Sequence, residues 1–505
     1  MRRKNTLAQR AQSAREAELN SDRGLHEGPT APYDPLPEAE AQRLIDAAIT
    51  LMHEIGVGFE PDPKVTGLFA DANCDISSGG TVKFPPDLVR RSIQSAAKST
   101  RLWNRAATDF IQIDNRHTWF VPGMTAINML DVDSGEPRSS TRDDLATITR
   151  VADALENIDA VCMGCKNVDR SDIFGEIEEF AVLAENTGKP LEYLCENARA
   201  LEVVIDMAAA IRGGRSALAE KPYFMHIVTP LPLYYAKAHT DQIITAIEAG
   251  IPVATGTVTI GGASAPITIA GCLVHCLATD LASIVLGQLV RKGSFCIGGS
   301  DPAFMEPATG GRGGFPQLSL ADGVLCQVCR IMGIPSMTGL GGRARARRFN
   351  QDAAWEISAN MMQTFYSRPA NCDYLGLMDE GLAYSLHALL YSNDLAGLLR
   401  RMWRGVRIDD ETLAMKLTRK EGARGNYLGQ THTAEFCRAE IWDARYFAAR
   451  QPLTMSTLPD VDLFERIDAD LREILINHRP EPLQESIREE LQSIQRSFES
   501  SYRAR

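Results

Sequence analysis

Apolar residues along the chain recur in short runs that are separated by longer amphipathic stretches. The short runs are rich in β-branched and aromatic residues and predict eight strands, at 119–121, 160–164, 191–196, 223–228, 253–260, 294–298, 334–337 and 372–377. The longer stretches show helical spacing and predict eight helices, at 141–155, 173–185, 198–211, 234–248, 267–291, 318–332, 352–366 and 382–402. Because strands separated by helices pair in parallel through crossover connections, we expect a parallel α/β fold.

Two α/β folds satisfy this alternation, an open doubly wound sheet and a closed (β/α)8 TIM barrel. Eight strand–helix units in about 290 residues match the usual size of the barrel. A glycine-rich dinucleotide fingerprint, which an open nucleotide-binding sheet would carry after its first strand, does not occur there. The sequence therefore favours a (β/α)8 barrel, which we expect to be the catalytic domain and to span residues 109–405.

Three further segments flank the predicted barrel. Residues 1–38 are polar, end in a proline-rich stretch and are typical of a flexible arm. Residues 39–108 predict a helical α/β module, which begins with an amphipathic helix closed by Gly56. Residues 406–505 predict a helical extension that packs on the barrel or serves in oligomerisation, and we expect a homo-oligomer.

The charge balance and the apolar segments limit the function classes. The chain has 505 residues, with 53 Lys and Arg against 65 Asp and Glu, and a net charge of -12, which disfavours nucleic acid as a partner. Its basic start is not followed by an apolar stretch, so we expect a cytoplasmic protein without a secretory signal. The long uncharged segment 249–279 carries two prolines and several glycines and predicts buried core rather than a membrane helix.

Eleven cysteines are too few for a disulfide scaffold in a chain of this length. Three pairs have the spacing of zinc ligands: Cys162 with Cys165, Cys272 with Cys276, and Cys326 with Cys329. The first pair lies in a predicted strand and the other two lie in apolar helical patterns, where small buried thiols are common. We therefore expect no metal site.

The active site of a barrel lies at the carboxyl ends of its strands and in the loops that follow. His226 is the only histidine on a predicted barrel strand, and either a site facing the lumen or a satisfied core position fits it. Asp301 directly follows a predicted strand, as a site residue or as a loop cap. Arg343, Arg345 and Arg347 alternate in one loop, which suits an anion site on a shared side or a solvated charged loop.

Several motifs spread over residues 40–445 resemble those of the trimethylamine methyltransferase superfamily, in its branch that lacks pyrrolysine and includes glycine betaine:corrinoid methyltransferases. The motifs are Asp131-Val-Asp-Ser-Gly-Glu-Pro-Arg138, Gly188-Lys-Pro-Leu191, Thr229-Pro-Leu-Pro-Leu233, Gly250-Ile-Pro-Val253, residues 261–271, residues 281–289, Gly333-Ile-Pro-Ser336, and Gln351, Asp352, Glu356, His432, Thr433, Arg438 and Glu440. The resemblance implies a (β/α)8 barrel, in agreement with the strand count.

The resemblance further implies methyl transfer from an amine to the cobalt of a corrinoid (cobalamin) carried by a partner protein, with no cofactor bound tightly to this chain. A hydrolytic Ser-His-Asp or Cys-His set does not stand out in the sequence, and no catalytic residue is assigned. That is consistent with a quaternary amine as donor, because demethylation leaves a neutral tertiary amine and needs no general acid. A neutral amine such as trimethylamine is a poorer donor, so we expect glycine betaine or a similar betaine or carnitine-type substrate.

Strand-end positions give candidate residues for that chemistry. Aromatic faces bind a quaternary ammonium ion with about 0.5–2 kcal/mol each, and carboxylates attract it. The candidates for the cation are Tyr193, Phe304, Tyr374, Trp103 and Asp301, those for a betaine carboxylate are Arg343, Arg345 and His226, and those facing the corrinoid partner are Gly261, Gly262, Ser264 and Asn167. Each aromatic residue also fits a plain core role, and the glycine-rich stretch 255–266 also fits a bend from strand into helix.

Three alternatives remain open at this stage. One is a barrel enzyme that binds cobalamin itself for other chemistry, and another is a zinc-dependent methyltransferase. The third is a barrel subunit without catalytic activity, which the neutral and crowded lumen expected here also permits.

Overall fold

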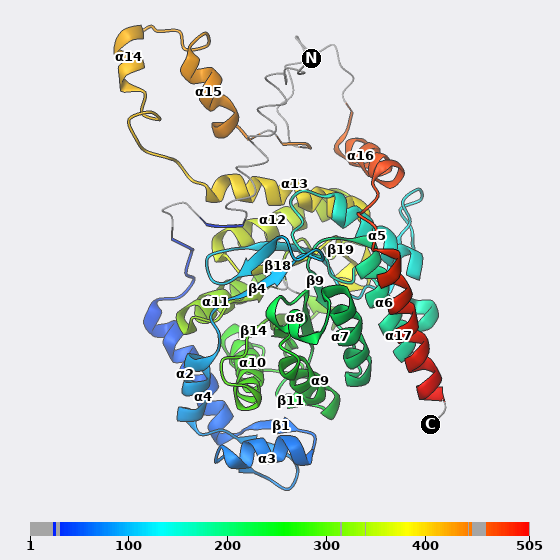
Figure 1. The fold of residues 1–505 in the computed structure, drawn as a ribbon. Helices are drawn as coiled ribbons and strands as arrows, with labels where there is room; N and C mark the ends of the chain where they lie inside the picture. Colours follow the sequence, from blue (N-terminus) through cyan, green and yellow to red (C-terminus); the bar gives the residue numbers. More distant parts are fainter. Residues whose placement is uncertain are drawn as a thin grey trace.

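The structure, a computed structural model, describes residues 24–26, 31–313, 316–338, 340–442, 444–446 and 461–503 (Figure 1). Most of the predicted arm at residues 1–38 lies outside the described residues. The described chain is a mixed α/β protein in which short central strands are surrounded by helices.

Seven central strands form two parallel sheets. One contains β9 (Leu191–Tyr193), β10 (Phe224–Val228), β12 (Val253–Thr255) and β14 (Cys296–Gly298), in the order β14-β12-β10-β9. The other contains β6 (Trp119–Pro122), β17 (Met337–Thr338) and β18 (Asn371–Leu375), in the order β17-β18-β6. Every pair within these two sheets is parallel, as the alternation of strands and helices predicts.

Backbone contacts connect the edges of the two sheets. Val161 forms a parallel bridge with Leu191 of β9, and the Asp159 N–H donates to the Phe120 carbonyl of β6 at 3.0 Å. At the other edge, Gly298 of β14 forms a parallel bridge with Ser336, next to β17. The predicted strand at 160–164 is therefore an extended segment with isolated bridges rather than a continuous ladder.

The predicted strand at 253–260 is in fact two strands. β12 ends at Thr255 and β13 (Val258–Gly261) begins three residues later. Gly256 lies between them, where a Cβ would come within 2.1 Å of the Gly299 carbonyl oxygen. Only glycine permits this close backbone approach, which turns the chain out of the central sheet.

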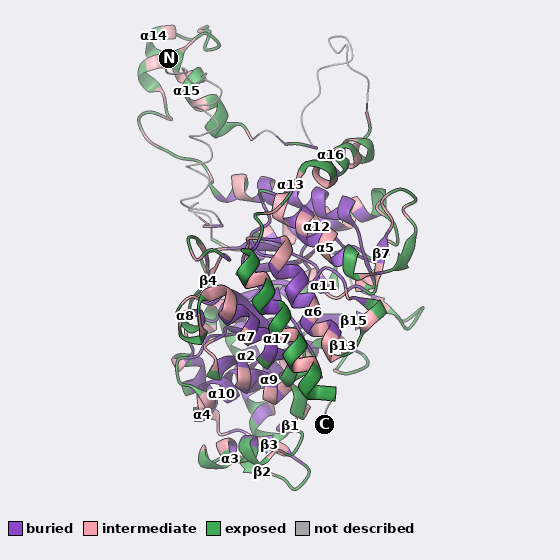
Figure 2. Cartoon of the chain, turned by 45° about the vertical axis from the view of Figure 1, so that its right-hand side comes forward, coloured by how far each residue is buried: buried purple, intermediate pink, exposed green. Residues whose placement is uncertain are grey.

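Eight helices pack around the central strands (Figure 2). They are α5 (Arg142–Ala154), α6 (Ile173–Asn186), α7 (Ala198–Arg212), α9 (Lys237–Glu248), α10 (Ile269–Val290), α11 (Gln317–Met332), α12 (Gln351–Ser367) and α13 (Leu386–Trp403), and a short α8 (Arg215–Glu220) follows α7. Each corresponds to a predicted helix, although the starts of the fourth and the eighth were placed too early. Tyr234 belongs to β11 (Tyr234–Tyr235), and α9 begins after it.

Among the described helices, α10 is the one that is long and apolar enough to cross a membrane. Most of its residues are buried, and α2 (Glu38–Glu54) and α4 (Pro86–Ser95) pack along it. A helix that is apolar on all sides fits such a buried core position. The part of the uncharged segment 249–279 that belongs to α10 is mostly buried from Cys272 onward, whereas residues 262–264 and 266–268 before it are exposed, so the expectation of a buried core holds only in part.

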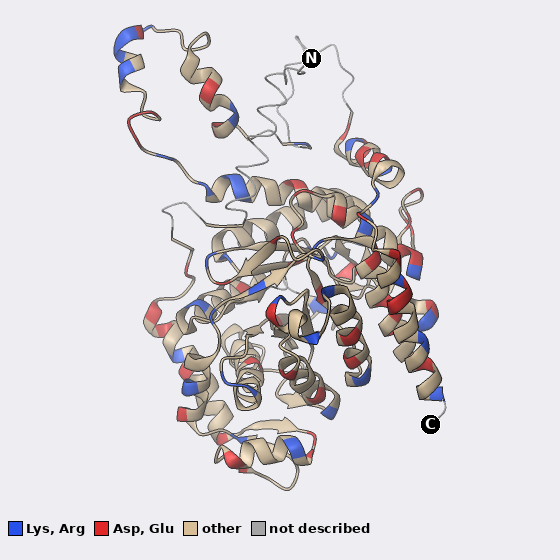
Figure 3. Ribbon diagram, in the orientation of Figure 1, with Lys and Arg blue, Asp and Glu red and all other residues tan. Residues whose placement is uncertain are grey.

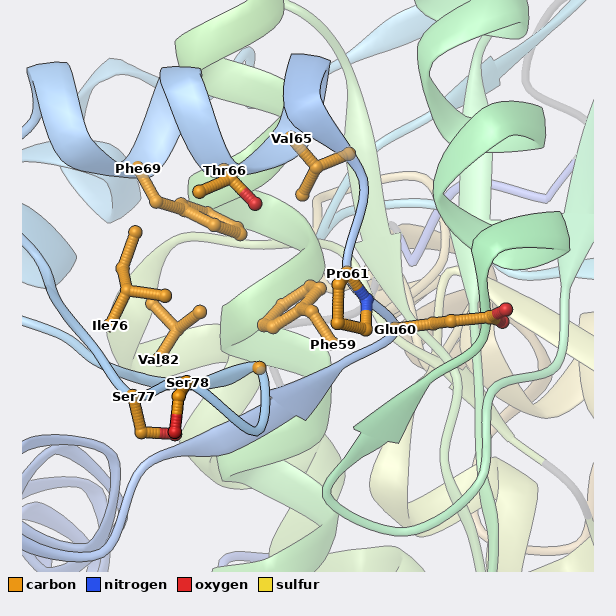
Figure 4. A pocket seen from close by; sticks show the side chains of 11 residues that line it. Phe59, Glu60, Pro61, Val65, Thr66, Phe69, Ile76, Ser77, Ser78 and Val82 are labelled. Carbon is orange, nitrogen blue, oxygen red and sulfur yellow. The ribbon is translucent and has the colours of Figure 1, made fainter.

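An N-terminal α/β unit covers α10. It contains α2, β1 (Val57–Phe59), α3 (Pro63–Asp71), β2 (Asp75–Ile76), β3 (Thr81–Lys83) and α4. β1 pairs in parallel with β11, which joins this unit to the loop before α9. A cavity of ≈ 180 Å³ lies within the unit, between Phe59, Phe69 and Val82 (Figure 4).

A hairpin of β4 (Thr100–Trp103) and β5 (Phe110–Ile113) lies across the amino-terminal ends of the central strands. The Trp103 N–H donates to the Pro222 carbonyl at 2.8 Å, and the Arg105 N–H donates to the Gly188 carbonyl at 2.9 Å. Pro222 and Gly188 each lie just before a central strand. This end of the strand array is therefore covered.

Two small sheets extend the opposite, carboxyl-terminal end. One contains β13, β15 (Asp301–Met305) and β16 (Arg312–Gly313), and the other contains β7 (Asn128–Leu130), β8 (Pro137–Ser139), β19 (Leu377–Met378) and β20 (Ala383–Tyr384).

The C-terminal part has two different surroundings. α14 (Met415–Glu421) and α15 (Thr431–Glu440) extend away from the rest of the chain and are largely exposed (Figures 1 and 2). α16 (Leu463–Asn477) returns to pack on α13 and α5, and α17 (Glu485–Arg503) packs on α6 and α7.

Candidate functional site

The strand registers determine which side chains point to the inside of the strand array. In parallel sheets, residues paired in register point to the same face, and successive residues alternate. His226 pairs with Tyr193, and both side chains point outward. The His226 Nε2 lies 3.0 Å from Gln242 Oε1 on α9, and the Tyr193 hydroxyl donates to the Glu176 carbonyl on α6.

This corrects the expectation that His226 and Tyr193 contribute to a site in the lumen. Both belong to the layer between strands and helices. Burial lowers the pKa of His226 to about 4, so its imidazole is neutral at physiological pH. His226 is thus a core residue, the alternative that the sequence left open, although its Nδ1 has no hydrogen-bond partner among the described residues.

Trp103 is also outside any site at the carboxyl ends of the strands. It lies on β4, at the amino-terminal ends, where the Lys221 ammonium nitrogen is 4.4 Å from its ring centroid. A cavity of ≈ 540 Å³ lies at this end, and Trp103, Lys221 and Pro222 are among the residues that line it. The prediction of a substrate role failed because the β4–β5 hairpin returns to the opposite end of the fold.

The arginines of the loop after β17 do not share a side. Arg343 points inward and is buried. Arg345 and Arg347 instead pair with the acids that follow β19, with Arg345 Nε 2.7 Å from Glu380 Oε1 and Arg347 Nε 3.5 Å from Asp379 Oδ1. The sequence expectation of one anion site formed by three arginines is therefore wrong, and Arg343 alone remains a candidate.

Arg343 belongs to a buried ionic cluster at the carboxyl ends of the strands. Asp301 Oδ2 accepts hydrogen bonds from Arg343 Nη1, at 3.0 Å, and from Arg312 Nη2. Burial opposes ionisation of Asp301, but the positive charges of Arg312 and Arg343 outweigh it and hold its pKa below the usual value. Two guanidinium groups therefore share one carboxylate, and the cluster has a net charge of +1.

Tyr374 covers Arg343 from the side of β18. Its ring centroid lies 5.4 Å from the guanidinium carbon of Arg343. Tyr374 has φ +68°, and the register with β6 shifts at this point, so its side chain departs from the strict alternation of the strand. A non-glycine residue in the left-handed region is uncommon and occurs often at functional sites. Among the described residues, Arg343 Nη2 has no hydrogen-bond partner.

A second polar group lies deeper, on the inner face of the strands. Glu192 of β9 and Asn371 of β18 meet across the array, and Glu192 Oε1 accepts from Asn371 Nδ2 at 2.6 Å. Asp373, two residues after Asn371, lies within hydrogen-bonding reach of Glu192. Glu192 and Asp373 are each 1% exposed, and burial raises the pKa of Glu192 to about 7 and that of Asp373 far above its usual value.

The sequence analysis missed this carboxyl pair. The available signal was a charged residue within each of two apolar strand patterns, Leu191-Glu-Tyr193 and Asn371-Cys-Asp373. Tyr374 links the two groups, because it directly follows Asp373 on β18 while its ring centroid lies 5.4 Å from the guanidinium carbon of Arg343. Arg343, Tyr374 and the carboxyl pair thus lie near one another at the carboxyl end of β18.

The residues expected to face a partner divide into two groups. Gly262, with φ +93°, and Ser264 form an exposed turn, in which Ser264 Oγ accepts from the Ile260 N–H at 2.8 Å. Asn167 is instead buried, and its N–H donates to Glu179 Oε1 at 2.8 Å. The prediction for Asn167 was wrong, because α6 covers it.

Phe304 packs against backbone rather than lining an open site. It lies on β15 in register with Gly261 of β13, where a Cβ would come within 2.8 Å of its ring. Gly261 is itself buried, so it supports the exposed turn from below instead of facing a partner.

The three cysteine pairs occupy apolar positions. Cys162 and Cys165 lie in the extended segment beside β9, Cys272 and Cys276 lie on α10, and Cys326 and Cys329 lie on α11. Within the ranges that the structure describes, three or more His, Cys, Asp or Glu side chains do not gather as metal ligands anywhere.

Comparisons with known proteins give a consistent result. The family model "Trimethylamine methyltransferase (MTTB)" matches residues 2–500. The chain is 28% identical over 424 residues to the trimethylamine methyltransferase MttB of Desulfitobacterium hafniense, covering 83% of this chain and 85% of that protein. It is 24% identical over 470 residues to the glycine betaine methyltransferase of Desulfitobacterium hafniense, covering 91% of this chain and 96% of that protein.

A solved structure of similar fold is the monomethylamine methyltransferase MtmB of Methanosarcina barkeri. The TM-score is 0.51 at 13% identity, and the match covers 92% of this chain and 91% of that chain. At this identity the likeness concerns the fold alone.

Proposed function

Because the chain belongs to the trimethylamine methyltransferase family and is a methyltransferase, we propose that it transfers a methyl group from a quaternary amine, such as glycine betaine or a carnitine-type compound, to a corrinoid carried by a separate protein. The observation that carries the proposal is the buried cluster of Asp301, Arg312 and Arg343 beside Tyr374. It combines a net positive charge with an aromatic ring at the carboxyl ends of the strands.

We further propose that the central strands form a closed (β/α)8 barrel. The support is that parallel pairings run from the segment 160–164 through β9, β10 and β12 to β14, and from Gly298 through Ser336, β17 and β18 to β6. The backbone hydrogen bond from Asp159 to Phe120 connects the two ends of this series. In such a barrel the Asp301 cluster lies at the mouth, where barrel enzymes bind their substrates.

The cluster fits a betaine carboxylate. The free Arg343 Nη2, with no partner in the described ranges, is a buried donor at a net positive site, and an arginine binds a carboxylate through charge-assisted hydrogen bonds. A substrate without a carboxylate would leave that donor unpaired, which costs binding free energy. The cluster therefore favours betaines over choline and trimethylamine.

The chain's own residues would bind and orient the donor. Arg343 holds the carboxylate end, and the ring of Tyr374 lies beside the bound substrate. When the methyl carbon–nitrogen bond breaks, both electrons stay on nitrogen, and a neutral tertiary amine leaves without a proton donor. A reduced corrinoid supplies the nucleophile for this transfer when the partner presents it.

We propose that the partner docks over the exposed turn at Gly262 and Ser264. This turn lies in the sheet that extends the carboxyl ends of the strands, and its flanking residues Val258 and Ile267 are 45% and 54% exposed.

The test is methylation of cob(I)alamin, followed by its absorbance, with glycine betaine, carnitine, proline betaine, choline and trimethylamine as donors. We expect turnover with at least one betaine and none with trimethylamine. Arg343→Gln should lower kcat/KM for that betaine by about tenfold or more, since it removes a charge-assisted hydrogen bond. Turnover with trimethylamine alone, or with none of the five compounds, would reject the proposal.

A further inference from the structure

We propose that the buried pair of Glu192 and Asp373, together with Asn371, is the part of the site that binds the quaternary ammonium group, and that the pair releases a proton when it does so. This inference rests on the proposed function and deepens it, because it assigns the cationic half of the substrate to residues on the inner face of the strands.

The strand registers place Glu192, Asn371 and Asp373 on one face. Glu192 pairs with Met225 of β10 and Asn371 pairs with Met337 of β17, and these side chains point away from the helices. Asp373 lies two residues after Asn371 on β18 and therefore points to the same face. The residues on either side of Glu192 and Asn371, such as Tyr193 and Cys372, contact α6 and α12 instead. The Glu192 carboxyl and the Asn371 amide thus lie on the same face as the apolar side chains of Met225 and Met337.

Acceptor oxygens in this cluster face each other without donors. Glu192 Oε2, Asn371 Oδ1 and both carboxyl oxygens of Asp373 have no hydrogen-bond partner among the described residues. Three of these four atoms belong to carboxyl groups, and the fourth is an amide oxygen. Buried acceptors are costly when unpaired, so either protons or a cation must satisfy them.

Other charged groups do not supply that cation. Arg312 and Arg343 each pair with Asp301, and Lys166 Nζ is 3.5 Å from Glu179 Oε2. The titratable groups that face the pair from the surrounding elements are Cys162 from the segment before β9, Tyr374 on β18 and, beyond it, Asp301, Arg312 and Arg343. Neither Cys162 nor Tyr374 carries a positive charge.

Protons therefore occupy the pair until a cation replaces them. Burial raises the pKa of Glu192 to about 7, and the neighbouring Glu192 carboxyl raises that of Asp373 further, so the pair retains a shared proton and half-ionises near neutrality. A quaternary ammonium group has no N–H and cannot donate a hydrogen bond. It is recognised through charge, so it selects the ionised pair and displaces a proton into solvent.

The site then has two ends that match a betaine. The ammonium group lies at Glu192 and Asp373, and the carboxylate lies at Arg343. Tyr374 adjoins both ends, because it directly follows Asp373 on β18 and its ring centroid is 5.4 Å from the guanidinium carbon of Arg343. Affinity for the cation should rise as the pH is raised through about 7 and level off above it. Proton release should be largest on the acidic side of that value.

Isothermal titration calorimetry with three probes tests the assignment. The probes are glycine betaine, tetramethylammonium and 3,3-dimethylbutanoate, in which carbon replaces the charged nitrogen of glycine betaine. Titrations at pH 6 in two buffers of different ionisation enthalpy measure the protons released. We expect proton release with glycine betaine and tetramethylammonium, and none with 3,3-dimethylbutanoate.

Matched variants separate the two ends of the site. Glu192→Gln keeps the size of the side chain and an acceptor for Asn371, and it should weaken glycine betaine by about tenfold or more at pH 8 and abolish proton release. Its affinity for 3,3-dimethylbutanoate should change by no more than about twofold, which is a smaller effect than the loss of one hydrogen bond would have. Arg343→Gln should weaken both carboxylate probes alike and leave tetramethylammonium unchanged.

The outcomes distinguish the inference from the function on which it rests. If glycine betaine binds without proton release, and Glu192→Gln weakens it no more than 3,3-dimethylbutanoate, the inference is overturned while the proposed function stands. If neither quaternary ammonium probe binds and cob(I)alamin is not methylated, both fall. Should Glu192→Gln fail to fold, Asp373→Asn and proton release by the unmodified chain decide the question.

Discussion

At the residue scale, the site depends on two groups of buried charged residues, one with a net positive charge and one with two carboxyl groups. Arg312 and Arg343 share one carboxylate at the carboxyl ends of the strands, whereas burial raises the pKa values of Glu192 and Asp373 on the inner face of the strands. The two groups have opposite electrostatic character, and Tyr374 adjoins both, since it follows Asp373 on β18 and its ring lies beside Arg343. A zwitterion, with its two charges separated by a short chain, complements such an arrangement better than a simple cation or anion.

The first prediction concerns Asp301. Asp301→Asn leaves two buried guanidinium groups without their carboxylate and should cost about 3–5 kcal/mol of unfolding free energy at pH 7. The pKa of Asp301 is depressed in the folded state, so its contribution is present above the usual value of 3.8 and is lost as the pH falls through the folded value. Melting temperatures measured from pH 7 down to pH 3 should therefore converge for the two proteins at the acidic end.

Asp379→Asn provides the control for that experiment, because Asp379 pairs with Arg347, whose side chain is 88% exposed. Exposed pairs contribute about 0–1 kcal/mol. An equal loss of stability in both variants would contradict the role given to the buried cluster.

The second prediction concerns Asp280 on α10. It accepts a hydrogen bond from the Ser300 hydroxyl at 2.7 Å, yet burial raises its pKa to about 7. Since the folded state retains the proton above the usual value of 3.8, the chain should lose stability as the pH rises from about 4 to about 7. Asp280→Asn removes this titration and should gain in melting temperature relative to the unmodified chain between pH 5 and pH 8.

Asp71→Asn, at an exposed acid, should follow the unmodified chain over the same pH range. If the pH profile of Asp280→Asn runs parallel to that of the unmodified chain, Asp280 does not titrate in this window.

Sequence alone identified one half of the candidate site. Asp301 and Arg343 follow predicted strands, and strand-end position is a local property that a sequence reveals. The pair of Glu192 and Asp373 depends on β9 and β18 facing each other, which is set by strand order and register. His226 failed for a related reason, because a shift of one residue along a strand exchanges the inner face for the helix-facing one.

At the element scale, the helices were predicted best. Eight helical patterns correspond to eight helices, since amphipathic spacing over several turns is a strong local signal. Strands were predicted less well because short apolar runs do not reveal where a ladder stops. The division at Gly256 shows this, since it arises from contact with Gly299, which no local pattern encodes.

The third prediction concerns the start of α5. Thr141 Oγ1 accepts from the Asp144 N–H at 3.3 Å, and Asp144 Oδ2 accepts from the Thr141 N–H at 2.9 Å. Thr141→Ala should cost about 0.5–2 kcal/mol of unfolding free energy, because it removes the hydroxyl that accepts the hydrogen bond from the Asp144 N–H in this capping box. Thermal unfolding measures the loss, and Thr141→Ser should retain most of the stability. A Ser variant as unstable as the Ala variant would show that the cap is not the cause.

At the scale of the whole molecule, the chain combines a compact body with a projecting segment. The segment from Gly405 to Glu440 has few contacts with the body, and Val406 and Leu428 within it are 72% and 86% exposed. Basic residues gather at its tip on α14 (Figure 3). Beyond it, α16 returns to the body, where His387 Nε2 lies 3.0 Å from Asp468 Oδ1.

The fourth prediction follows from this arrangement. Limited trypsin treatment should cut first between Arg407 and Arg424, because those basic residues are exposed on a segment with little packing. The two fragments should stay together in gel filtration, since α16 packs on α13 and α17 packs on α6 and α7. Mass spectrometry identifies the cut sites. Protection of Arg407 to Arg424 in the native protein would instead show that this segment is covered in solution.

The β4–β5 hairpin has a kinetic consequence for the proposed transfer. Because the hairpin contacts the residues before β9 and β10, the proposed transfer would bring both the donor and the corrinoid to the carboxyl-terminal end of the strands. In the proposed transfer the donor would then bind before the corrinoid protein docks, and the demethylated amine would be released only after that protein dissociates. Turnover would follow an ordered binding mechanism. An excess of the corrinoid protein would inhibit it, because that protein would dock on the chain before the donor has bound.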